Sequence, residues 1–282
     1  MEMAEQDAAN LTTMNVKCTH ADGRNGLGFS LPFFDQMLCA LWKFKAKHVT
    51  NSTIATWFGV HPKTIQTYLR KWCPLLGSTG RALVFIPSSQ YLKDTQPDLM
   101  KDNGMANVVL AGDCTEVVTE TVRKHILIQG QQYADKSHCS AAIGCSFTTT
   151  RGGTAVALDL ALGRASEDQL TQIIAKYIQI DPDLELMYDK GCPHIRAYLP
   201  NFNNVLIPIF LRPSQGKDKF TDEEASHNRA CATGRYVVEV SYMRVKLWGL
   251  ISPVVAREDF HYLNDCWWWA LGYNNLCYKL VR

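Results

Sequence analysis

The sequence lacks the long apolar runs that mark membrane-spanning helices. Its longest apolar candidates, at 107–111 and 247–256, are far shorter than the roughly 18 residues that a bilayer requires. The first residues also lack the basic start and apolar stretch of a secretory signal, because they include Glu2, Glu5 and Asp7. We therefore expect a soluble intracellular protein with no membrane partner.

Paired metal-binding cysteines are absent as well. The ten cysteines contain no Cys-x-x-Cys pair, which zinc modules usually show. A disulfide framework is typical of small secreted domains, so free thiols in the core are the better interpretation. The composition, with 46% hydrophobic and 20% charged residues, excludes a disordered tail, a coiled coil and a collagen-like fibre.

The formal net charge of +2 is unevenly distributed. Residues 1–40 sum to −3, whereas residues 41–72 carry six basic side chains and no acid. The remaining residues sum to −1. A compact basic segment on a balanced chain indicates a local anionic partner, although charge alone fits a solvated helix face equally well.

The pattern within the basic segment favours a helix-turn-helix. Gly59 suits the left-handed turn that ends a first helix, and Pro62 suits the first turn of a second. Ile65 and Leu69 lie one helical turn apart and predict its buried stripe. The outward residues then supply what binding to double-stranded DNA requires: Lys63, Thr64, Gln66, Thr67, Arg70 and Lys71. We expect Trp42, Trp57 and Trp72 to lie in the core.

The rest of the chain indicates an α/β domain. A connecting stretch at 73–105 contains three prolines, and apolar runs that predict strands follow it. These strands are expected at 106–111, 140–148, 154–162, 184–188 and 205–210, with a hairpin turn at Gly152-Gly153. Ser166 predicts the start of a helix with Leu170, Ile173, Ile174 and Tyr177 on one face, and a long helix is expected from Thr221 to about Leu250. This order predicts a mixed sheet flanked by helices.

Three acids stand out in this domain. Asp113 and Asp189 each follow a predicted strand, where α/β proteins place ligands. Glu239 lies within an apolar sequence of the long helix, where a buried unpaired charge is costly. Taken singly, the aspartates could be strand-end caps and Glu239 could pair with Arg235 one turn earlier. Taken together, the three carboxylates are typical of a site for divalent ions such as Mg²⁺.

The motifs resemble those of the DDE-superfamily transposases, in particular the Harbinger-like group. The resemblance covers roughly residues 40–280 and follows the order of that family. It rests on the helix-turn-helix at 49–72 and on six short motifs: Asp113-Cys114-Thr115-Glu116, Gly163-Arg164-Ala165-Ser166, Tyr188-Asp189-Lys190-Gly191, Leu206-Ile207-Pro208, Arg235-Tyr236-Val237-Val238-Glu239 and Asn275-Leu276.

The resemblance implies a ribonuclease-H-like catalytic domain that binds two Mg²⁺ or Mn²⁺ ions through Asp113, Asp189 and Glu239. The implied reaction is hydrolysis of DNA at transposon ends, followed by joining of the freed 3′-hydroxyls to target DNA. Lys136, Arg164 and Lys190 are implied phosphate contacts, with ordinary surface charge as the alternative. The resemblance also implies a nuclear location.

The expected organisation is an acidic arm at 1–40, a helix-turn-helix domain at 41–75, a connector at 76–105 and the catalytic domain at 106–282. Val240 stands where family members usually have Arg, and the acidic arm shows no zinc-binding spacing. The chain could therefore be a domesticated, catalytically silent DNA-binding protein, or could need a separate DNA-binding partner protein. A homo-oligomer is a further alternative, with Trp267-Trp268-Trp269 in an interface or, preferably, in the core.

Overall fold

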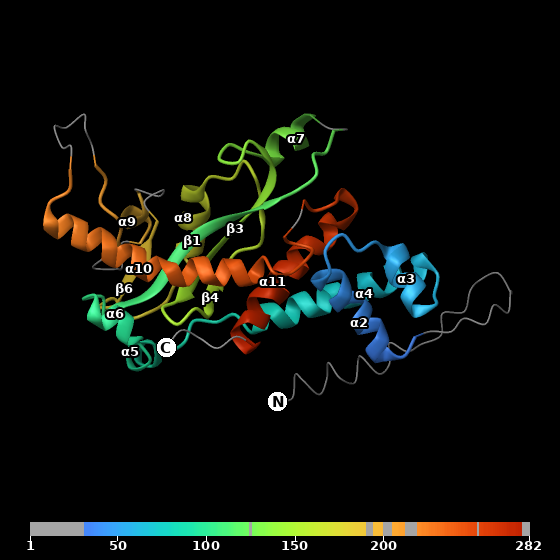
Figure 1. Ribbon diagram of the computed structural model, residues 1–282, viewed down its shortest axis with the longest axis horizontal. Coiled ribbons are helices and arrows are strands. Elements are labelled where there is room, and N and C mark those ends of the chain that lie inside the picture. The colour runs from blue at the N-terminus through green and yellow to red at the C-terminus, as the bar shows by residue number, and fades with distance from the viewer. Residues whose placement is uncertain are drawn as a thin grey trace, which may run out of the picture. The chain divides into compact units, whose positions relative to one another are not determined.

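The computed structural model describes residues 31–123, 126–189, 194–199, 205–211, 219–252 and 254–277 (Figure 1). The described residues from Phe33 onward belong to one compact unit. The predicted acidic arm lies mostly outside the described residues, and so does Lys190. No helix among the described residues is long and apolar enough to cross a membrane.

The predicted helix-turn-helix is confirmed. Helix α2 (Phe33–Lys45) precedes α3 (Asn51–Phe58) and α4 (Pro62–Ala82). Gly59 caps α3 with φ of 63°, and Pro62 occupies the first turn of α4, as the sequence predicts. Ile65 and Leu69 are fully buried.

Two features of this region differ from prediction. Helix α4 continues through Ala82 into the expected connector, and α5 (Ser89–Asp94) and α6 (Asp98–Asp102) occupy part of the remainder. Trp57 is 72% exposed rather than buried, because it projects from the surface of α3 and contacts only the edge of the core through Trp42. Trp72 is buried as expected, and Trp42 is half-buried.

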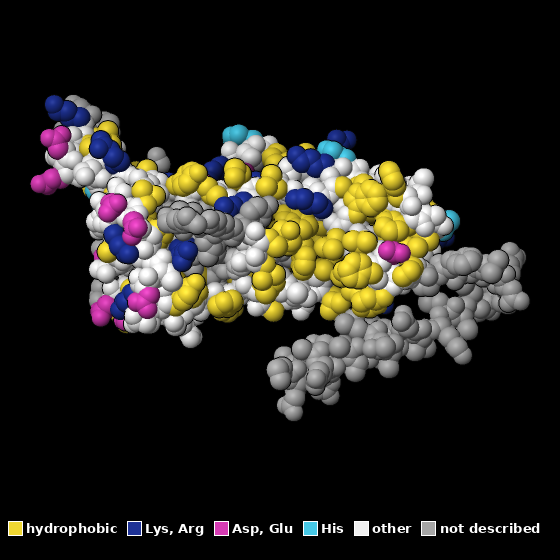
Figure 2. Space-filling model, turned by 60° about the horizontal axis from the view of Figure 1, so that its bottom comes forward, with side chains coloured by type: hydrophobic (Ala, Val, Ile, Leu, Met, Phe, Trp, Pro, Cys, Tyr) yellow, Lys and Arg dark blue, Asp and Glu magenta, His cyan; other side chains and the backbone are white. Residues whose placement is uncertain are grey.

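Long helix α4 packs closely against α11 (Phe260–Cys277), side by side in Figure 1. Glycines allow this approach, because a Cβ on Gly80 would lie 2.3 Å from the Trp268 carbonyl oxygen. Trp267 and Trp268 are buried in this region, which confirms the core interpretation of the tryptophan run. Exposed apolar side chains lie on several elements and include Leu127 and, on α11, Leu276. Figure 2 shows a group of them on the face near α2 and α4, where Phe34 is 64% exposed.

The described chain after α6 contains a seven-stranded mixed sheet with a central path β2-β3-β1-β6-β7. The strands are β1 (Val108–Val118), β2 (Tyr133–Ala134), β3 (Cys139–Thr149), β4 (Thr154–Ala157), β5 (Ala161–Leu162), β6 (Glu185–Tyr188) and β7 (Val205–Leu206). Strand β1 pairs with β3 in antiparallel and with β6 in parallel orientation, while β4 and β5 extend from β3. The predicted α/β class and mixed sheet are therefore confirmed.

Helices cover this sheet. Helix α7 (Ile126–Gln132) contacts β3, whereas α8 (Glu167–Ala175) and α9 (Ile195–Tyr198) join the strands in a common core. Helix α10 (Asp222–Val245) crosses the sheet and contacts β1, β3 and β6 (Figure 1). A 3₁₀ turn, Arg257–Asp259, precedes α11.

Several predicted boundaries were accurate and others were not. Ser166 and Thr221 both form capping boxes, and Gly152 turns the β3–β4 hairpin with φ of 93°. The paired part of β7 is only two residues long, and α10 ends at Val245, where the Lys246 amide bonds back to Tyr242. Ile173 and Tyr177 are exposed, because α8 buries only the side that carries Leu170 and Ile174.

Candidate functional site

The two aspartates lie side by side on neighbouring parallel strands. Gly112 of β1 is in register with Tyr188 of β6, so the next residues, Asp113 and Asp189, are adjacent at the edge of that pairing. Asp113 lies in the middle of β1, because pairing with β3 extends the strand to Val118 beyond the predicted end. The prediction of a strand end held only for Asp189.

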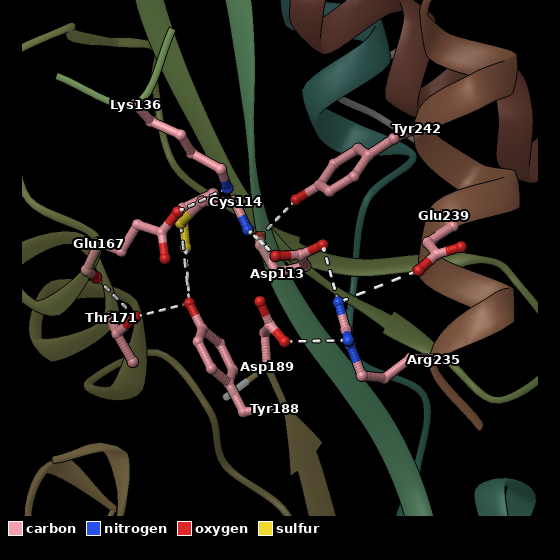
Figure 3. Close-up of polar contacts among 11 residues, drawn as sticks. Asp113, Cys114, Lys136, Glu167, Thr171, Tyr188, Asp189, Arg235, Glu239 and Tyr242 are labelled. Atoms are coloured by element: carbon pink, nitrogen blue, oxygen red, sulfur yellow. Dashed lines mark hydrogen bonds and ion pairs between the residues drawn. The ribbon is translucent and has the colours of Figure 1, made fainter. Parts of the chain in front are cut away.

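Asp113 is held by hydrogen bonds on two sides. Its Oδ1 accepts a bond of 2.8 Å from the backbone amide of Cys114, and its backbone oxygen accepts one of 2.5 Å from the Tyr242 hydroxyl (Figure 3). Tyr242 lies on α10 and also accepts a bond of 3.0 Å from Ser146 on β3. The phenol therefore ties α10 to the strand that carries Asp113.

Burial raises the pKa of Asp113 to about 6. The Cys114 amide and the Arg235 guanidinium oppose this shift, whereas the nearby carboxylates of Asp189 and Glu167 add to it. Tyr188 and Cys114 beneath the site also have raised pKa values: burial is the main cause for Tyr188, whereas for Cys114 the hydrogen bond with Cys145 is the main cause and burial the second. Both groups are therefore neutral packing groups at physiological pH.

Glu239 approaches the Arg235 guanidinium from α10. Its side chain is 62% exposed, so the expected cost of burying this charge does not arise. A close helix–strand approach brings α10 to the sheet: a Cβ on Gly234 would lie 2.6 Å from the Met187 methyl group of β6. The next residue, Arg235, therefore faces the ends of the two aspartates.

Arg235 lies among all three carboxylates, as Figure 3 shows. Its nitrogen atoms are 2.9 Å from Asp189 Oδ1, 3.9 Å from Asp113 Oδ2 and 4.0 Å from Glu239 Oε1. The pairing of Glu239 with Arg235, which the sequence left open as an alternative, is thus present. Three carboxylates gathered round one guanidinium are less repulsive than they would be alone.

The oxygen donors have the right chemistry for Mg²⁺ or Mn²⁺, but their arrangement does not fit a bound ion as it stands. Among the residues that the structure describes, no group of three or more His, Cys, Asp or Glu side chains is placed to hold a metal ion. We attribute this arrangement to the Arg235 guanidinium, because it contacts each of the three carboxylates that would have to surround an ion.

A polar groove of about 680 Å³ borders Asp189. Two of the predicted phosphate contacts, Lys136 and Arg164, line it, and Lys136 lies 3.5 Å from Glu167. Lys246 lines it as well, and sequence reasoning missed this residue. Helical spacing could have found it, because Arg235, Glu239, Tyr242 and Lys246 follow one face of α10 at steps of four, three and four.

The predicted DNA-binding side chains of α4 divide into two groups. Lys63, Thr67 and Arg70 are exposed, whereas Thr64 and Gln66 are half-buried. Lys71 is also half-buried, and its amine lies 5.4 Å from the centre of the Trp72 ring and 5.6 Å from that of Phe33. The charge of Lys71 is therefore engaged within the fold.

The eight described cysteines are free thiols, as expected, and six of them are buried. The remaining two are the half-buried Cys139 and the exposed Cys277. None belongs to a group that could hold a metal among the described residues.

Two family models match the chain. Residues 29–82 match the helix-turn-helix of DDE superfamily endonuclease, and residues 112–266 match the DDE superfamily endonuclease itself. The second match runs from the residue before Asp113 to the middle of α11 and includes all three carboxylates. Neither the curated proteins nor the solved structures yield a match.

Proposed function

Because the chain belongs to the DDE superfamily endonucleases, with a helix-turn-helix of the same superfamily before it, we propose that it is a transposase that cleaves DNA. The sheet has the ribonuclease-H-like form of that superfamily. The observation that supports the proposal is that Asp113, Asp189 and Glu239, which come from two neighbouring strands and a helix, all lie within 4.0 Å of the Arg235 guanidinium.

The proposed reaction has two steps. A water oxygen attacks a phosphorus at the transposon end, and the 3′-oxygen leaves with a proton as a free hydroxyl. That hydroxyl then attacks a phosphorus of target DNA and displaces the target's own 3′-oxygen. Two Mg²⁺ or Mn²⁺ ions, when bound by the three carboxylates, would supply activation of the nucleophile and stabilisation of the leaving oxygen.

The surrounding residues have supporting roles in this proposal. Tyr242 and the Cys114 amide position Asp113, so that its carboxylate stays at the sheet edge beside Asp189. Lys136 and Arg164 would bind phosphates along the groove that borders Asp189. Lys63, Thr67 and Arg70 would contact double-stranded DNA from the exposed side of α4. Thr64, Gln66, Lys71 and Lys190 stay predictions.

The test is nicking of supercoiled plasmid with Mn²⁺ or Mg²⁺. We expect nicking by the wild-type chain, and a loss of at least about 100-fold in Asp113→Asn, because the chemical step depends on this carboxylate. Asp183→Asn, which changes an exposed aspartate before β6, is the matched control and should cleave normally. Robust cleavage by Asp113→Asn would contradict the proposal.

A second function is favoured by the guanidinium among the carboxylates. If wild-type protein binds duplex DNA with a strong salt dependence but never nicks it, the chain is a domesticated, catalytically silent DNA-binding protein.

The division into an arm, a helix-turn-helix domain, a connector and a catalytic domain stays a prediction. The Harbinger-like subgroup, a homo-oligomer, a separate DNA-binding partner and the nuclear location stay predictions as well.

A further inference from the structure

The carboxylate site already contains a cation of its own. We propose that the Arg235 guanidinium occupies the place of a divalent ion, and that metal binding requires this side chain to withdraw. The inference rests on the proposed function, because it concerns the same three carboxylates. It explains why all three carboxylates contact one guanidinium, although they do not form a group that could hold a metal among the described residues.

The backbone brings Arg235 to this position. Gly234 allows α10 to touch Met187 of β6, and Arg235 follows directly with its side chain toward the sheet edge (Figure 3). Glu239 lies one helical turn further along and approaches the guanidinium from the solvent side. A planar guanidinium can contact several carboxylate groups at once, which the compact ammonium of lysine does less well.

The contacts of Arg235 with the three carboxylates differ in length, which makes withdrawal of its side chain feasible. Only the contact with Asp189, at 2.9 Å, has the length of a hydrogen-bonded ion pair. The contacts with Asp113 and Glu239, at 3.9 and 4.0 Å, are longer than that. The Arg235 Nε atom is buried and has no hydrogen-bond partner in the described structure. The side chain also remains 20% exposed, so a path to solvent exists.

The charges make guanidinium and metal competitors. An ion placed between the carboxylates would lie within a few ångströms of the guanidinium, and like charges at that distance repel strongly where water is scarce. A divalent ion would bring more charge and can take several carboxylate oxygens at once. It can therefore displace Arg235, but with an apparent affinity reduced by the need to do so.

The first measurement is Mn²⁺ binding to the DNA-free full chain by isothermal titration calorimetry. Arg235→Gln should bind Mn²⁺ about tenfold more tightly than wild type, or better, because no cation has to leave. Arg235→Lys should bind Mn²⁺ no more tightly than wild type, because the ammonium keeps a positive charge within the same carboxylate cluster and that charge must still leave. Arg229→Gln is the matched control: it removes an exposed arginine from the same helix and should match wild type.

Thermal unfolding supplies a second measurement that does not depend on catalysis. Without metal, Arg235→Gln should unfold at a lower temperature than wild type, since the carboxylates lose their counter-ion. Saturating Mn²⁺ should then raise its unfolding temperature more than that of wild type. Arg235→Lys keeps the test valid if the glutamine variant fails to fold, because its Mn²⁺ affinity must not exceed that of wild type.

The outcomes separate this inference from the proposed function. If Mn²⁺ binds wild type and Arg235→Gln equally, or binds the variant more weakly, Arg235 does not compete with the metal and the inference is overturned while the proposed function stands. If no variant binds Mn²⁺, although each folds, the proposed metal-dependent function is overturned too. Tighter binding by Arg235→Gln alone supports both.

Discussion

Two cations that pair with acids in this molecule, Lys43 and Arg235, have very different surroundings. Lys43, on α2, is 2% exposed, lies 2.8 Å from Asp259 and donates a bond of 2.8 Å to the Val49 carbonyl. Arg235 is shared among three carboxylates, and only one of its contacts is short. Lys43 therefore pairs with one acid, whereas Arg235 contacts three.

The difference indicates what each group is for. The Lys43–Asp259 pair joins the helix-turn-helix region to the turn before α11. The backbone amides of Gly249 and Leu250, which follow α10, also donate hydrogen bonds to the α2 backbone. The charges of the Lys43–Asp259 pair are balanced, as a structural pair requires. In the carboxylate cluster, three acids lie around one guanidinium near the surface, and the proposed role of this cluster is to bind a metal ion. The Lys43–Asp259 pair stabilises the fold.

The largest effect is expected from breaking the balanced pair. Lys43→Met should lower the free energy of unfolding by about 3–5 kcal/mol, because it leaves the Asp259 carboxylate buried without a partner. Urea unfolding followed by circular dichroism measures this. The double variant Lys43→Met, Asp259→Leu should recover much of the loss. If Lys43→Met alone costs less than about 1 kcal/mol, the pair is not the structural contact described above.

An intermediate effect is expected at the carboxylate cluster, and it depends on pH. The pKa of Asp113 is raised by burial to about 6, whereas an aspartate in the unfolded chain titrates near 4. Between these values the folded state binds more protons, so the free energy of unfolding falls as pH rises from about 4 to about 6 and stays lower above it.

Asp113→Asn removes this ionisation. In EDTA at pH 7.5 the variant should be more stable than wild type by about 2 kcal/mol, and the difference should vanish near pH 4. Thermal or urea unfolding across this pH range measures it. A variant less stable than wild type at pH 7.5 would mean that the contact of Asp113 with Arg235 outweighs the cost of burial.

The smallest effect is expected on the exposed side of α4, where the charges have no buried partner. Lys63→Ala with Arg70→Ala should leave stability within about 0.5 kcal/mol of wild type, as surface substitutions usually do. The same variant should bind duplex DNA more weakly, with a log–log salt slope reduced by about 2. Fluorescence anisotropy at several salt concentrations measures both. Lys176→Ala, an exposed charge at the end of α8, is the control and should change neither quantity.

Local patterns determined much of what could be predicted. Gly59, Pro62, Ile65 and Leu69 define the helix-turn-helix within a dozen residues, because turn and capping preferences act over a few residues. The capping boxes at Ser166 and Thr221 were predictable for the same reason. The ordered motifs around Asp113, Asp189 and Glu239 indicate the family from the sequence alone, and the family match agrees with them.

Contacts between distant segments were decided only by the tertiary structure. Asp113 lies inside a strand because β3 extends its pairing, and Trp57 is exposed because no other element covers that side of α3 in the described structure. No spacing in the sequence shows that one guanidinium reaches the side chains of Asp113 and Asp189 as well as Glu239, because those distances depend on how α10 crosses the sheet at Gly234. The sequence by itself pointed to the candidate residues of the site, since residue type and local spacing are written in it. Only the packing of helix on sheet decided that the carboxylates meet Arg235, since it joins residues as distant in the sequence as Asp113 and Arg235.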